Sequence, residues 1–470
     1  MKILLASMSI ESESRFKNSS NCAYPLGLAY IYSVLEKDGH EDKLLFLNNF
    51  DQEKSEKIFC DTLEEWQPQV VGFQIFGMNR VSTFNAIEKM KNTHPDIRIM
   101  IGGIHTSVMY EQIIRKYPHL VAVIGEGEYA MAELLKAFES NSPLNSIKGI
   151  CFYKDGNVIQ TEPRELIYDL DSLPFPKHEV FFDNEPGRTM GHIISSRGCP
   201  FNCSFCCLKI ISKRKHRKRD ITKVVEEIEY LKKKYPRLKH IQFHDDTFCL
   251  DNERVIQFCK MIIEKKISLI FSCSTRVKPI SKEMFQWMEK AGFKNIMFGL
   301  ETGAENLLQS IHKNITHKDV IELFNVLKHF KFVITTFLMC GFPGENDETI
   351  AQTIDLVQRT QKIHYNYIAG VGKLLVYPGT EVYERMKEAG RINDDFWLTD
   401  KPVPYYTVEY PFEKLVEFEQ RIMNAVSIEK ILTPKGFKNH FMKMPITILG
   451  FLAGHPRRLA GIIRYMIRGY

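Results

Sequence analysis

Short apolar runs alternate with segments of helical periodicity over the first 140 residues. The predicted strands are Ile3–Ala6, Lys43–Leu47, Val70–Phe76, Ile97–Ile101 and Val121–Ile124. The helices predicted between them are Leu26–Lys37, Lys54–Trp66, Val81–Asn92, Val108–Lys116 and Tyr129–Ala137. Strands that are apolar on both faces and alternate with helices form parallel sheets covered by helices. We therefore expect an α/β domain over residues 1–140, with ligands at the carboxyl ends of its strands.

A second alternating stretch begins near residue 191, after a linker. Four prolines between residues 163 and 186 predict an irregular connector over residues 141–190. Strands are then predicted at His192–Ser195, His240–His244, Leu269–Ser274, Asn295–Gly299, Val333–Met339 and Gly370–Val376. Helices are predicted at Ile221–Lys234, Glu253–Lys265, Lys282–Lys290, Asn306–Ser310, Lys318–Phe330 and Asp347–Thr360. Six such units over residues 191–395 fit a partial barrel better than the eight units of a closed one.

Residues 396–470 predict a mainly helical and basic extension. Residues 401–470 hold eleven Lys or Arg against five Glu, a surplus equal to the net charge of +6 of the whole chain. The apolar positions of the last helix follow the i, i+3, i+4 pattern at Leu459, Ile462, Ile463, Met466 and Ile467. A basic amphipathic helix of this kind either lies in a membrane interface or packs on the barrel.

The localisation expected from the sequence is cytoplasmic. No run reaches the roughly 18 apolar residues of a transmembrane helix, and the first residues do not form a secretory leader. If the last helix binds anionic lipid, the protein would associate with the inner face of the membrane.

Three cysteines carry the most specific chemistry in the chain. Cys199, Cys203 and Cys206 form a CxxxCxxC pattern directly after the first predicted barrel strand. Three thiolates can hold three irons of a cubic [4Fe–4S] cluster and leave the fourth iron open, whereas electron-carrier clusters use four cysteines. The alternatives are a zinc site, which would need a fourth ligand at close spacing, and a disulfide framework, which eleven cysteines in 470 residues do not suggest. The spacing favours a cluster with chemistry at the open iron.

Other predicted barrel strands also end in polar side chains. Asp245 and Asp246 end the second strand, Ser274 and Arg276 the third, and Glu301 the fourth. A guanidinium fork can hold a carboxylate with two hydrogen bonds, so Arg276 is a candidate anion ligand. Each residue alone can instead be a loop cap or a surface ion pair. Barrel enzymes, however, gather their chemistry at this end of the strands.

The cysteine loop and its flanks resemble the radical S-adenosylmethionine (SAM) enzymes. The resemblance implies that the three cysteines ligate a [4Fe–4S] cluster whose open iron binds SAM, and that Phe205 lies against the adenine. The SAM contacts implied or suggested at the other strand ends are Asp245, Asp246, Ser274, Arg276 and Glu301. Reductive cleavage of SAM, with electrons from a donor such as flavodoxin or ferredoxin, would give a 5′-deoxyadenosyl radical that abstracts hydrogen from the substrate.

Two glycine-rich loops follow strands of the first domain. Gly102-Gly103-Ile104-His105 follows the fourth predicted strand, and Gly125-Glu126-Gly127-Glu128 follows the fifth. Glycines let a backbone approach a bulky planar ligand closely, although a tight turn is the ordinary role of such loops. No GxGxxG follows the first strand, so a dinucleotide site is not indicated.

Together with the segment Tyr24–Tyr30, these loops resemble the Rossmann-like cobalamin-binding domain that precedes many radical SAM cores. The cobalamin contacts that the resemblance implies are Gly102, Gly103, His105, Gly125, Glu126 and Gly127. The DxHxxG motif, whose histidine ligates cobalt in many cobalamin enzymes, is absent from the chain, as is common in the radical SAM subgroup. His105 is therefore expected to contact the corrin or its tail, with a structural role as the alternative.

A basic run, Lys213–Arg219, follows the cysteine loop. It can bind anionic groups of a substrate, bind RNA or form a solvated loop. RNA-modifying methylthiotransferases share the radical SAM core but carry an N-terminal three-cysteine domain. Here only Cys22 and Cys60 precede the linker. We therefore expect no nucleic-acid partner.

The resemblance covers residues 1–395 and implies an enzyme with a [4Fe–4S] cluster, SAM and cobalamin as cofactors. The main expectation is a C-methyltransferase that abstracts hydrogen from an unactivated carbon, which then receives a methyl group from methylcobalamin. The rival is a radical cyclase or rearrangement enzyme of the tetrapyrrole cyclase type. A third interpretation is a cobalamin or cluster sensor without turnover. The expected substrate is a small molecule, and a lipid-like molecule, a tetrapyrrole and a secondary metabolite all remain candidates.

Overall fold

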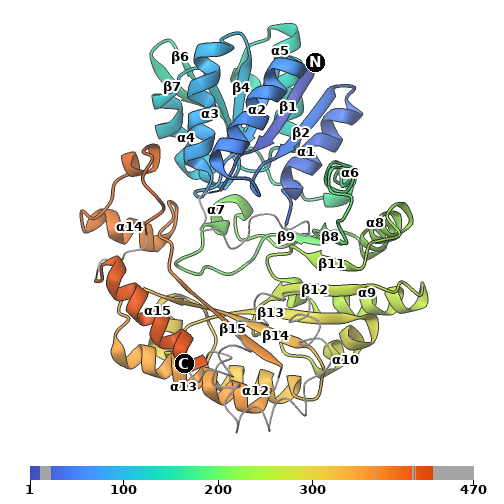
Figure 1. The fold of residues 1–470 in the computed structure, drawn as a ribbon, viewed down its shortest axis with the longest axis vertical. Coiled ribbons are helices and arrows are strands. Elements are labelled where there is room, and N and C mark those ends of the chain that lie inside the picture. Colours follow the sequence, from blue (N-terminus) through green and yellow to red (C-terminus); the bar gives the residue numbers. More distant parts are fainter. Residues whose placement is uncertain (11–22, 365, 405–406, 408, 427–470) are drawn as a thin grey trace, which may run out of the picture.

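The computed structural model describes residues 1–10, 23–364, 366–404, 407 and 409–426. Two α/β bodies, each built around its own sheet, lie one above the other in Figure 1. The cysteine loop and the short helix α7 (Leu208–Ser212) lie between them. The predicted α/β class and the order of the two bodies are confirmed.

The first sheet has seven strands in the order β2-β1-β3-β4-β5-β6-β7. Its strands are β1 (Lys2–Ser7), β2 (Glu41–Phe46), β3 (Val70–Gln74), β4 (Arg98–Gly102), β5 (Leu120–Val123), β6 (Ile150–Lys154) and β7 (Asn157–Gln160). Its helices are α1 (Leu26–Lys37), α2 (Gln52–Trp66), α3 (Arg80–Thr93), α4 (Ile104–Lys116) and α5 (Glu128–Ser140). Strands β1 to β5 are parallel. The strand order reverses between β1 and β3, and open α/β sheets bind ligands at such a point.

The hairpin of β6 and β7 extends this sheet beyond residue 140. β6 pairs antiparallel with β5, and β7 with β6. The hairpin turns at Asp155-Gly156, whose φ angles of 50° and 83° are both left-handed. Asp-Gly is a preferred pair for a two-residue hairpin turn. The prediction of an irregular stretch is therefore wrong for these residues, because it gave more weight to the later prolines than to this turn signal.

The second sheet has six parallel strands that follow one another in chain order. They are β8 (Met190–Ile193), β11 (His240–Phe243), β12 (Ile270–Thr275), β13 (Phe293–Glu301), β14 (Val333–Cys340) and β15 (Tyr367–Lys373). The helices beside them are α8 (Ile221–Lys234), α9 (Asn252–Glu264), α10 (Lys282–Ala291), α11 (Glu305–Ser310), α12 (His317–Leu327) and α13 (Asp347–Ile363). Because β8 and β15 are the two edges of the sheet, the predicted partial barrel is confirmed.

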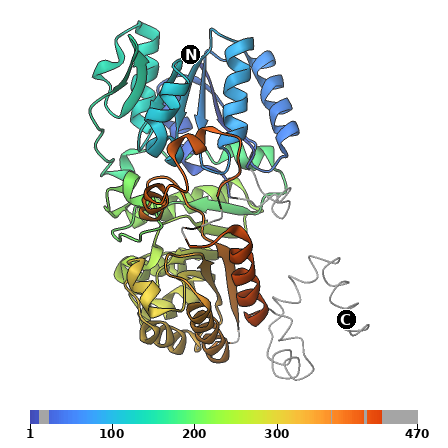
Figure 2. The ribbon, with the colours of Figure 1, turned by 90° about the vertical axis from the view of Figure 1, so that its left-hand side faces the viewer.

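The chain after β15 returns to the N-terminal domain, as the orange segment in Figure 2 shows. This segment carries α14 (Glu381–Glu388) and a 3₁₀ turn, Asp394–Leu398. Trp397 in the turn is fully buried, and its ring centroid lies 5.5 Å from that of His105 in α4. Lys116 Nζ, at the end of α4, donates to the carbonyl oxygen of Leu398 at 2.7 Å. The two bodies are thus joined by contacts between residues 282 positions apart.

Helix α15 (Phe412–Val426) packs on α13 and on strands β14 and β15. The described part of the predicted C-terminal extension therefore ends in a helix on the barrel. The basic helix predicted around Leu459–Ile467 lies outside the described residues. Over the part of the chain that the structure describes, no helix has both the length and the apolar character needed to cross a bilayer.

Candidate functional site

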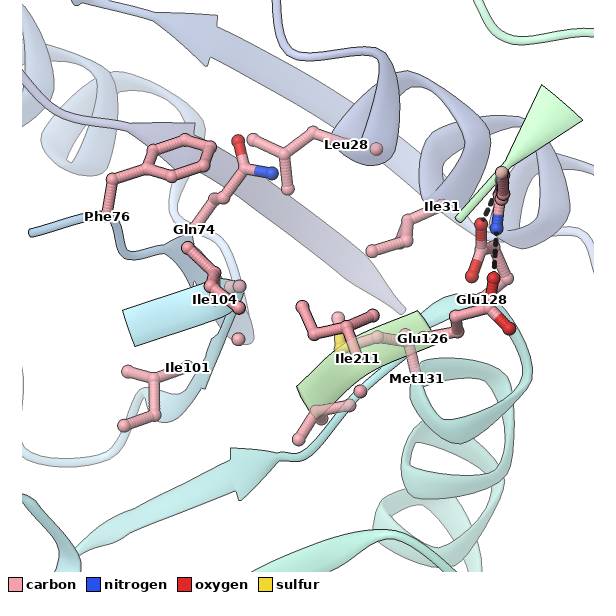
Figure 3. Close-up of a pocket in the computed structure, with 18 of the residues that line it drawn as sticks. Leu28, Ile31, Gln74, Phe76, Ile101, Ile104, Glu126, Glu128, Met131 and Ile211 are labelled. Atoms are coloured by element: carbon pink, nitrogen blue, oxygen red, sulfur yellow. Dashed lines mark hydrogen bonds and ion pairs between the residues drawn. The ribbon is translucent and has the colours of Figure 1, made fainter. Parts of the chain in front are cut away.

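A cavity of about 300 Å³ lies between the two bodies, at the carboxyl ends of the strands of the first sheet (Figure 3). Its N-terminal wall includes the glycine-rich loops that we predicted to hold cobalamin. Its opposite wall includes Arg197 and Gly198, which lead into the cysteine loop, and Asp246 from the end of β11. The structure therefore brings the glycine-rich loops and the residues that lead into the cysteine loop to the same cavity, although none of the three cysteines is among its lining residues.

Glycines in the N-terminal wall leave room for a bulky ligand. Gly103 has a φ of 96°, and a Cβ there would lie 2.8 Å from the carbonyl oxygen of Ile75, so the backbone turn requires glycine. Gly125 has a φ of 86°, and a Cβ there would meet no atom within 4 Å. At Gly102 the nearest atom to a Cβ would be 3.9 Å away. The space beside these bare backbones fits a large planar group such as a corrin.

The carboxylates of Glu126 and Glu128 turn toward arginines of the second domain (Figure 3). Glu126 accepts from Arg197 at 2.8 Å and from Arg217 at 2.7 Å, and Glu128 accepts from Arg197 at 2.7 Å. Burial alone would raise the pKa of the Glu126 carboxyl, but the hydrogen bonds and charges of Arg217 and Arg197 hold it below its usual value. Glu126 lines the cavity, but the negative charge of its carboxylate is compensated by Arg197 and Arg217.

His105 lies in the first turn of α4 rather than in a loop. It is 2% exposed, and its Nε2 has no hydrogen-bond partner among the described residues. Burial and then the charge of Arg80 lower its pKa to about 3, so the imidazole is neutral at physiological pH. It does not line the first cavity. It lines a second cavity of about 310 Å³ that shares Phe76 and Ile104 with the first.

The cysteine loop begins at the short strand β9 (Ser196–Arg197), which pairs antiparallel with β10 (Arg217–Lys218). Gly198 has a φ of 87°, and a Cβ there would lie 2.1 Å from the carbonyl oxygen of Lys215. Only glycine can therefore precede Cys199 in this turn. The Asp246 carboxylate accepts from the Gly198 amide at 2.8 Å and fixes the same turn.

The thiols of the loop are free, and the Cys203 sulfur lies near a cation. Within the part of the chain that the structure describes, no three His, Cys, Asp or Glu side chains are already close enough together to hold a metal ion. Arg276 Nη1 lies 3.5 Å from Cys203 Sγ, and its guanidinium stacks 3.8 Å from the centroid of the Phe201 ring. Burial raises the pKa of the Cys199 thiol and raises that of Cys206 to about 11, with smaller contributions from the neighbouring cysteines. Iron would displace these protons, because metal ligation requires the thiolate. A soft donor set of three thiols fits an iron–sulfur cluster.

Asp245 and Asp246 have different surroundings although they are adjacent. Both Asp245 oxygens are occupied inside the protein, by the Ser195 amide at 2.7 Å and by the Ser195 and Ser196 hydroxyls at 2.6 and 2.5 Å. Asp245 therefore stabilises the connection between β8 and β9. Since both of its oxygens already accept hydrogen bonds from protein, it is not positioned as a SAM ligand. Asp246 faces the cavity, and burial raises its pKa to about 6.

The remaining predicted SAM contacts lie at the mouth of the barrel. Glu301 sits at the end of β13 with a φ of 70° and pairs with Lys313 Nζ at 2.6 Å in a buried contact. Ser274, near the end of β12, is half-buried. Phe205 is half-buried, with its ring centroid 5.5 Å from that of Phe342. Sequence reasoning missed Lys313 and Arg197, because their partners are set by the fold and not by any local spacing.

Three of the seven residues of the basic run Lys213–Arg219 form ion pairs with acidic side chains. Arg217 pairs with Glu126, Lys218 with Asp251 at 2.8 Å, and Arg219 with Glu227 at 2.6 Å. Arg217 and Arg219 are buried, whereas Lys213 is exposed. The run mainly fastens the cysteine loop to its surroundings.

Glu345, in the loop after β14, gives the barrel a pH-dependent stability. It is 2% exposed, its Oε1 has no partner among the described residues, and burial raises its pKa to about 7. An acid with a raised pKa in the folded state destabilises the fold as it ionises, so this contribution is lost as the pH rises from about 4.5 to 7. Relative to Glu345→Gln, we expect wild type to lose about 3 kcal/mol between pH 4 and 8. Urea denaturation of both proteins at several pH values measures this, and parallel pH curves would contradict it.

Two family models match the chain. The model of the radical SAM superfamily matches residues 193–357, and that of the B12 binding domain matches residues 16–135. The first match begins in β8 and contains the cysteine loop, and the second contains both glycine-rich loops. The expected cofactor set of a [4Fe–4S] cluster, SAM and cobalamin is confirmed by these two domains.

Known proteins with related sequences are similar over most of the chain. An uncharacterized methyltransferase of Pyrococcus horikoshii is 26% identical over 474 residues, which cover 100% of this chain and 99% of that protein. An anaerobic magnesium-protoporphyrin IX monomethyl ester cyclase of Rubrivivax gelatinosus is 26% identical over 345 residues, which cover 71% of this chain and 62% of that protein.

Solved structures show the same arrangement of domains. The radical SAM methyltransferase TsrM of Kitasatospora setae, with cobalamin and a [4Fe–4S] cluster bound, has a TM-score of 0.68 at 17% identity and covers 90% of this chain and 81% of its own. The cobalamin-dependent radical SAM enzyme OxsB, with aqua-cobalamin and SAM bound, has a TM-score of 0.69 at 16% identity and covers 83% of this chain and 60% of its own. The chain therefore carries a B12-binding domain ahead of a radical SAM domain.

Proposed function

We propose that this protein is a cobalamin-dependent radical SAM enzyme that methylates an unactivated carbon of a small molecule. The observation that carries the proposal is that the first cavity is lined both by the glycine-rich loops of the B12-binding domain and by the start of the cysteine loop. When bound, the cluster and SAM supply a hydrogen-abstracting radical, and cobalamin supplies a methyl carrier. The protein's part is to bind these groups, orient them and exclude water.

Different side chains at the mouth of the barrel would bind the cluster, SAM and the substrate. Cys199, Cys203 and Cys206 hold the cluster, and the guanidinium of Arg276 offsets negative charge beside Cys203. Phe205 would lie against the adenine of SAM. Ser274, Glu301 and Asp246 supply polar contacts to SAM or to the substrate. An external donor of the flavodoxin or ferredoxin class supplies electrons, in keeping with a cytoplasmic location.

The second cavity favours a substrate with an apolar, uncharged part. Its lining residues are Ile10, Phe76, Gly77, Met78, Ile104, His105, Val108, Cys207, Tyr377 and Pro378. No charged side chain is among the described residues that line it. It reaches from the cysteine loop, at Cys207, to the strand ends of the B12-binding domain. Such a lining suits a lipid-like molecule or the apolar edge of a tetrapyrrole better than a phosphate group. Membrane contact through the basic helix around Leu459–Ile467 would suit such a substrate and stays a prediction.

A second candidate function is a radical cyclisation without net methylation. The similarity to magnesium-protoporphyrin cyclases favours it, since one of them matches 71% of this chain. The two functions differ in what happens to SAM. Methylation converts one SAM to 5′-deoxyadenosine and a second to S-adenosylhomocysteine, whereas cyclisation yields only the first product.

An anaerobic assay of the reconstituted full chain tests the proposal. The mixture contains hydroxocobalamin, SAM, a reductant and a metabolite extract, and mass spectrometry follows both SAM products. Deoxyadenosine together with substrate-dependent S-adenosylhomocysteine supports methylation. Deoxyadenosine alone supports the cyclase, and the absence of both products would contradict either enzyme.

A further inference from the structure

We propose that Glu126 and Glu128 position the cysteine loop and couple cobalamin binding to the cluster, instead of binding cobalamin themselves. The proposal rests on the function proposed above and adds two positioning residues to it. The four side chains concerned, Glu126, Glu128, Arg197 and Arg217, are called the inter-domain clamp below. Figure 3 shows its ion pairs at the edge of the cavity.

The clamp is a buried and electrically balanced set of two carboxylates and two guanidinium groups. Arg197 spans both acids, with Nη1 2.8 Å from Glu126 Oε1 and Nη2 2.7 Å from Glu128 Oε1. Arg217 Nη1 holds the other oxygen of Glu126 at 2.7 Å. The four side chains are between 4% and 15% exposed. Ion pairs that are this well shielded from water hold the two domains in a fixed relative position, because moving one partner away would leave an uncompensated buried charge.

The acidic half of the clamp lies between β5 and the first residue of α5, along the wall of the cavity. Gly125, Glu126, Gly127 and Glu128 all line the cavity. The left-handed Gly125, where a Cβ would meet no atom within 4 Å, leaves the backbone of this loop directly beside the space for the corrin. Because both carboxylates are hydrogen-bonded to arginines, cobalamin would contact the backbone of the loop. A shift of the loop on binding would then be transmitted to the other domain through these side chains.

The basic half of the clamp belongs to the frame of the cysteine loop. Arg197 lies two residues before Cys199, and Arg197 and Arg217 face each other in the β9–β10 pair. The next residue, Gly198, is held by Asp246 from the same cavity wall. A shift of the glycine-rich loop therefore moves the start of the cysteine loop through two charged hydrogen bonds to one guanidinium.

Coupling through the clamp must be reciprocal. If the assembled cluster favours the clamped position of the loop, it raises the affinity for cobalamin, and cobalamin favours the assembled cluster by the same factor. Coupling between two sites of a protein is commonly about 5- to 150-fold. We expect cluster-loaded wild type to bind hydroxocobalamin about tenfold more tightly than cluster-free wild type.

The test variant is Arg197→Met with Glu128→Met, in the full chain. Removing both partners leaves no unpaired charge, and Glu126 keeps Arg217. Hydroxocobalamin is titrated anaerobically into cluster-free and cluster-loaded protein and followed by absorbance. In the variant the ratio of the two affinities is expected to fall to about one. The electron paramagnetic resonance signal of the reduced cluster with SAM is expected to respond to cobalamin in wild type only.

The matched control is Lys373→Met with Glu419→Met, which removes an ion pair of similar burial within the barrel, with side chains 15% and 18% exposed. It should keep the wild-type ratio. A wild type that binds hydroxocobalamin equally with and without its cluster would overturn the coupling while leaving the proposed function intact, and so would a test variant that keeps the ratio. A wild type that binds no hydroxocobalamin overturns the proposed function and the coupling together.

Discussion

Cys203→Ala is expected to abolish the cluster and all cleavage of SAM. Cys203 is 8% exposed in the middle of the loop, with Arg276 3.5 Å from its sulfur. Loss of this ligand leaves two thiols for a cluster that three must hold, and alanine cannot replace a thiolate. Iron and sulfide content after anaerobic reconstitution measures the cluster, and 5′-deoxyadenosine measures SAM cleavage.

The neighbouring thiol provides the control for this loss. Cys207→Ala removes an equally free cysteine next to Cys206, but one whose residue lines the second cavity. It should still assemble the cluster and cleave SAM in the absence of substrate. If Cys203→Ala retained iron at the wild-type level and produced deoxyadenosine, the cysteine loop would not be the cluster site.

Gly102→Phe is expected to prevent cobalamin binding while leaving SAM cleavage intact. Gly102 lines the cavity, is not left-handed, and would place a Cβ no closer than 3.9 Å to any neighbour. The fold should tolerate the side chain, whereas its ring would occupy space in a cavity of about 300 Å³. Equilibrium dialysis with hydroxocobalamin should show at least about a hundredfold weaker binding, since such a clash and lost contact exceed about 3 kcal/mol.

Gly187→Phe serves as the matched control for that variant. Gly187 is exposed, is not left-handed, and a Cβ there would meet no atom within 4 Å. It should bind hydroxocobalamin as wild type does. In the methylation assay Gly102→Phe should still yield deoxyadenosine but no S-adenosylhomocysteine. Unchanged cobalamin affinity in Gly102→Phe would place the corrin elsewhere.

The fold and the position of the site follow from local patterns in the sequence. Apolar runs such as Ile3–Ala6 and Val70–Phe73 are buried on both faces, so their strand assignment did not depend on distant partners. The cysteine loop and the glycine-rich loops follow strands, and parallel topology gathers such loops at one edge. The sequence could therefore predict that the glycine-rich loops lie at one edge of the first sheet and that the cysteine loop lies at one edge of the second.

The roles of the acidic residues could not be predicted in the same way. Asp245 and Asp246 are identical in type, yet one is enclosed by Ser195 and Ser196 and the other faces the cavity. Glu126 was expected to contact cobalamin, but its partner Arg197 lies 71 positions away in the chain. Which carboxylate finds a cation depends on the docking of two domains, and no periodicity within either domain encodes that docking.

The segment that carries Trp397 implies an order of assembly. Its contacts with α4 join residues 282 positions apart, so they form only after nearly the whole barrel has been synthesised. N-terminal domains generally fold first during synthesis. Until the turn Asp394–Leu398 docks, Tyr377 and Pro378 do not yet wall the second cavity. The second cavity, which we propose for the substrate, is therefore expected to gain its complete wall only after both domains have been synthesised.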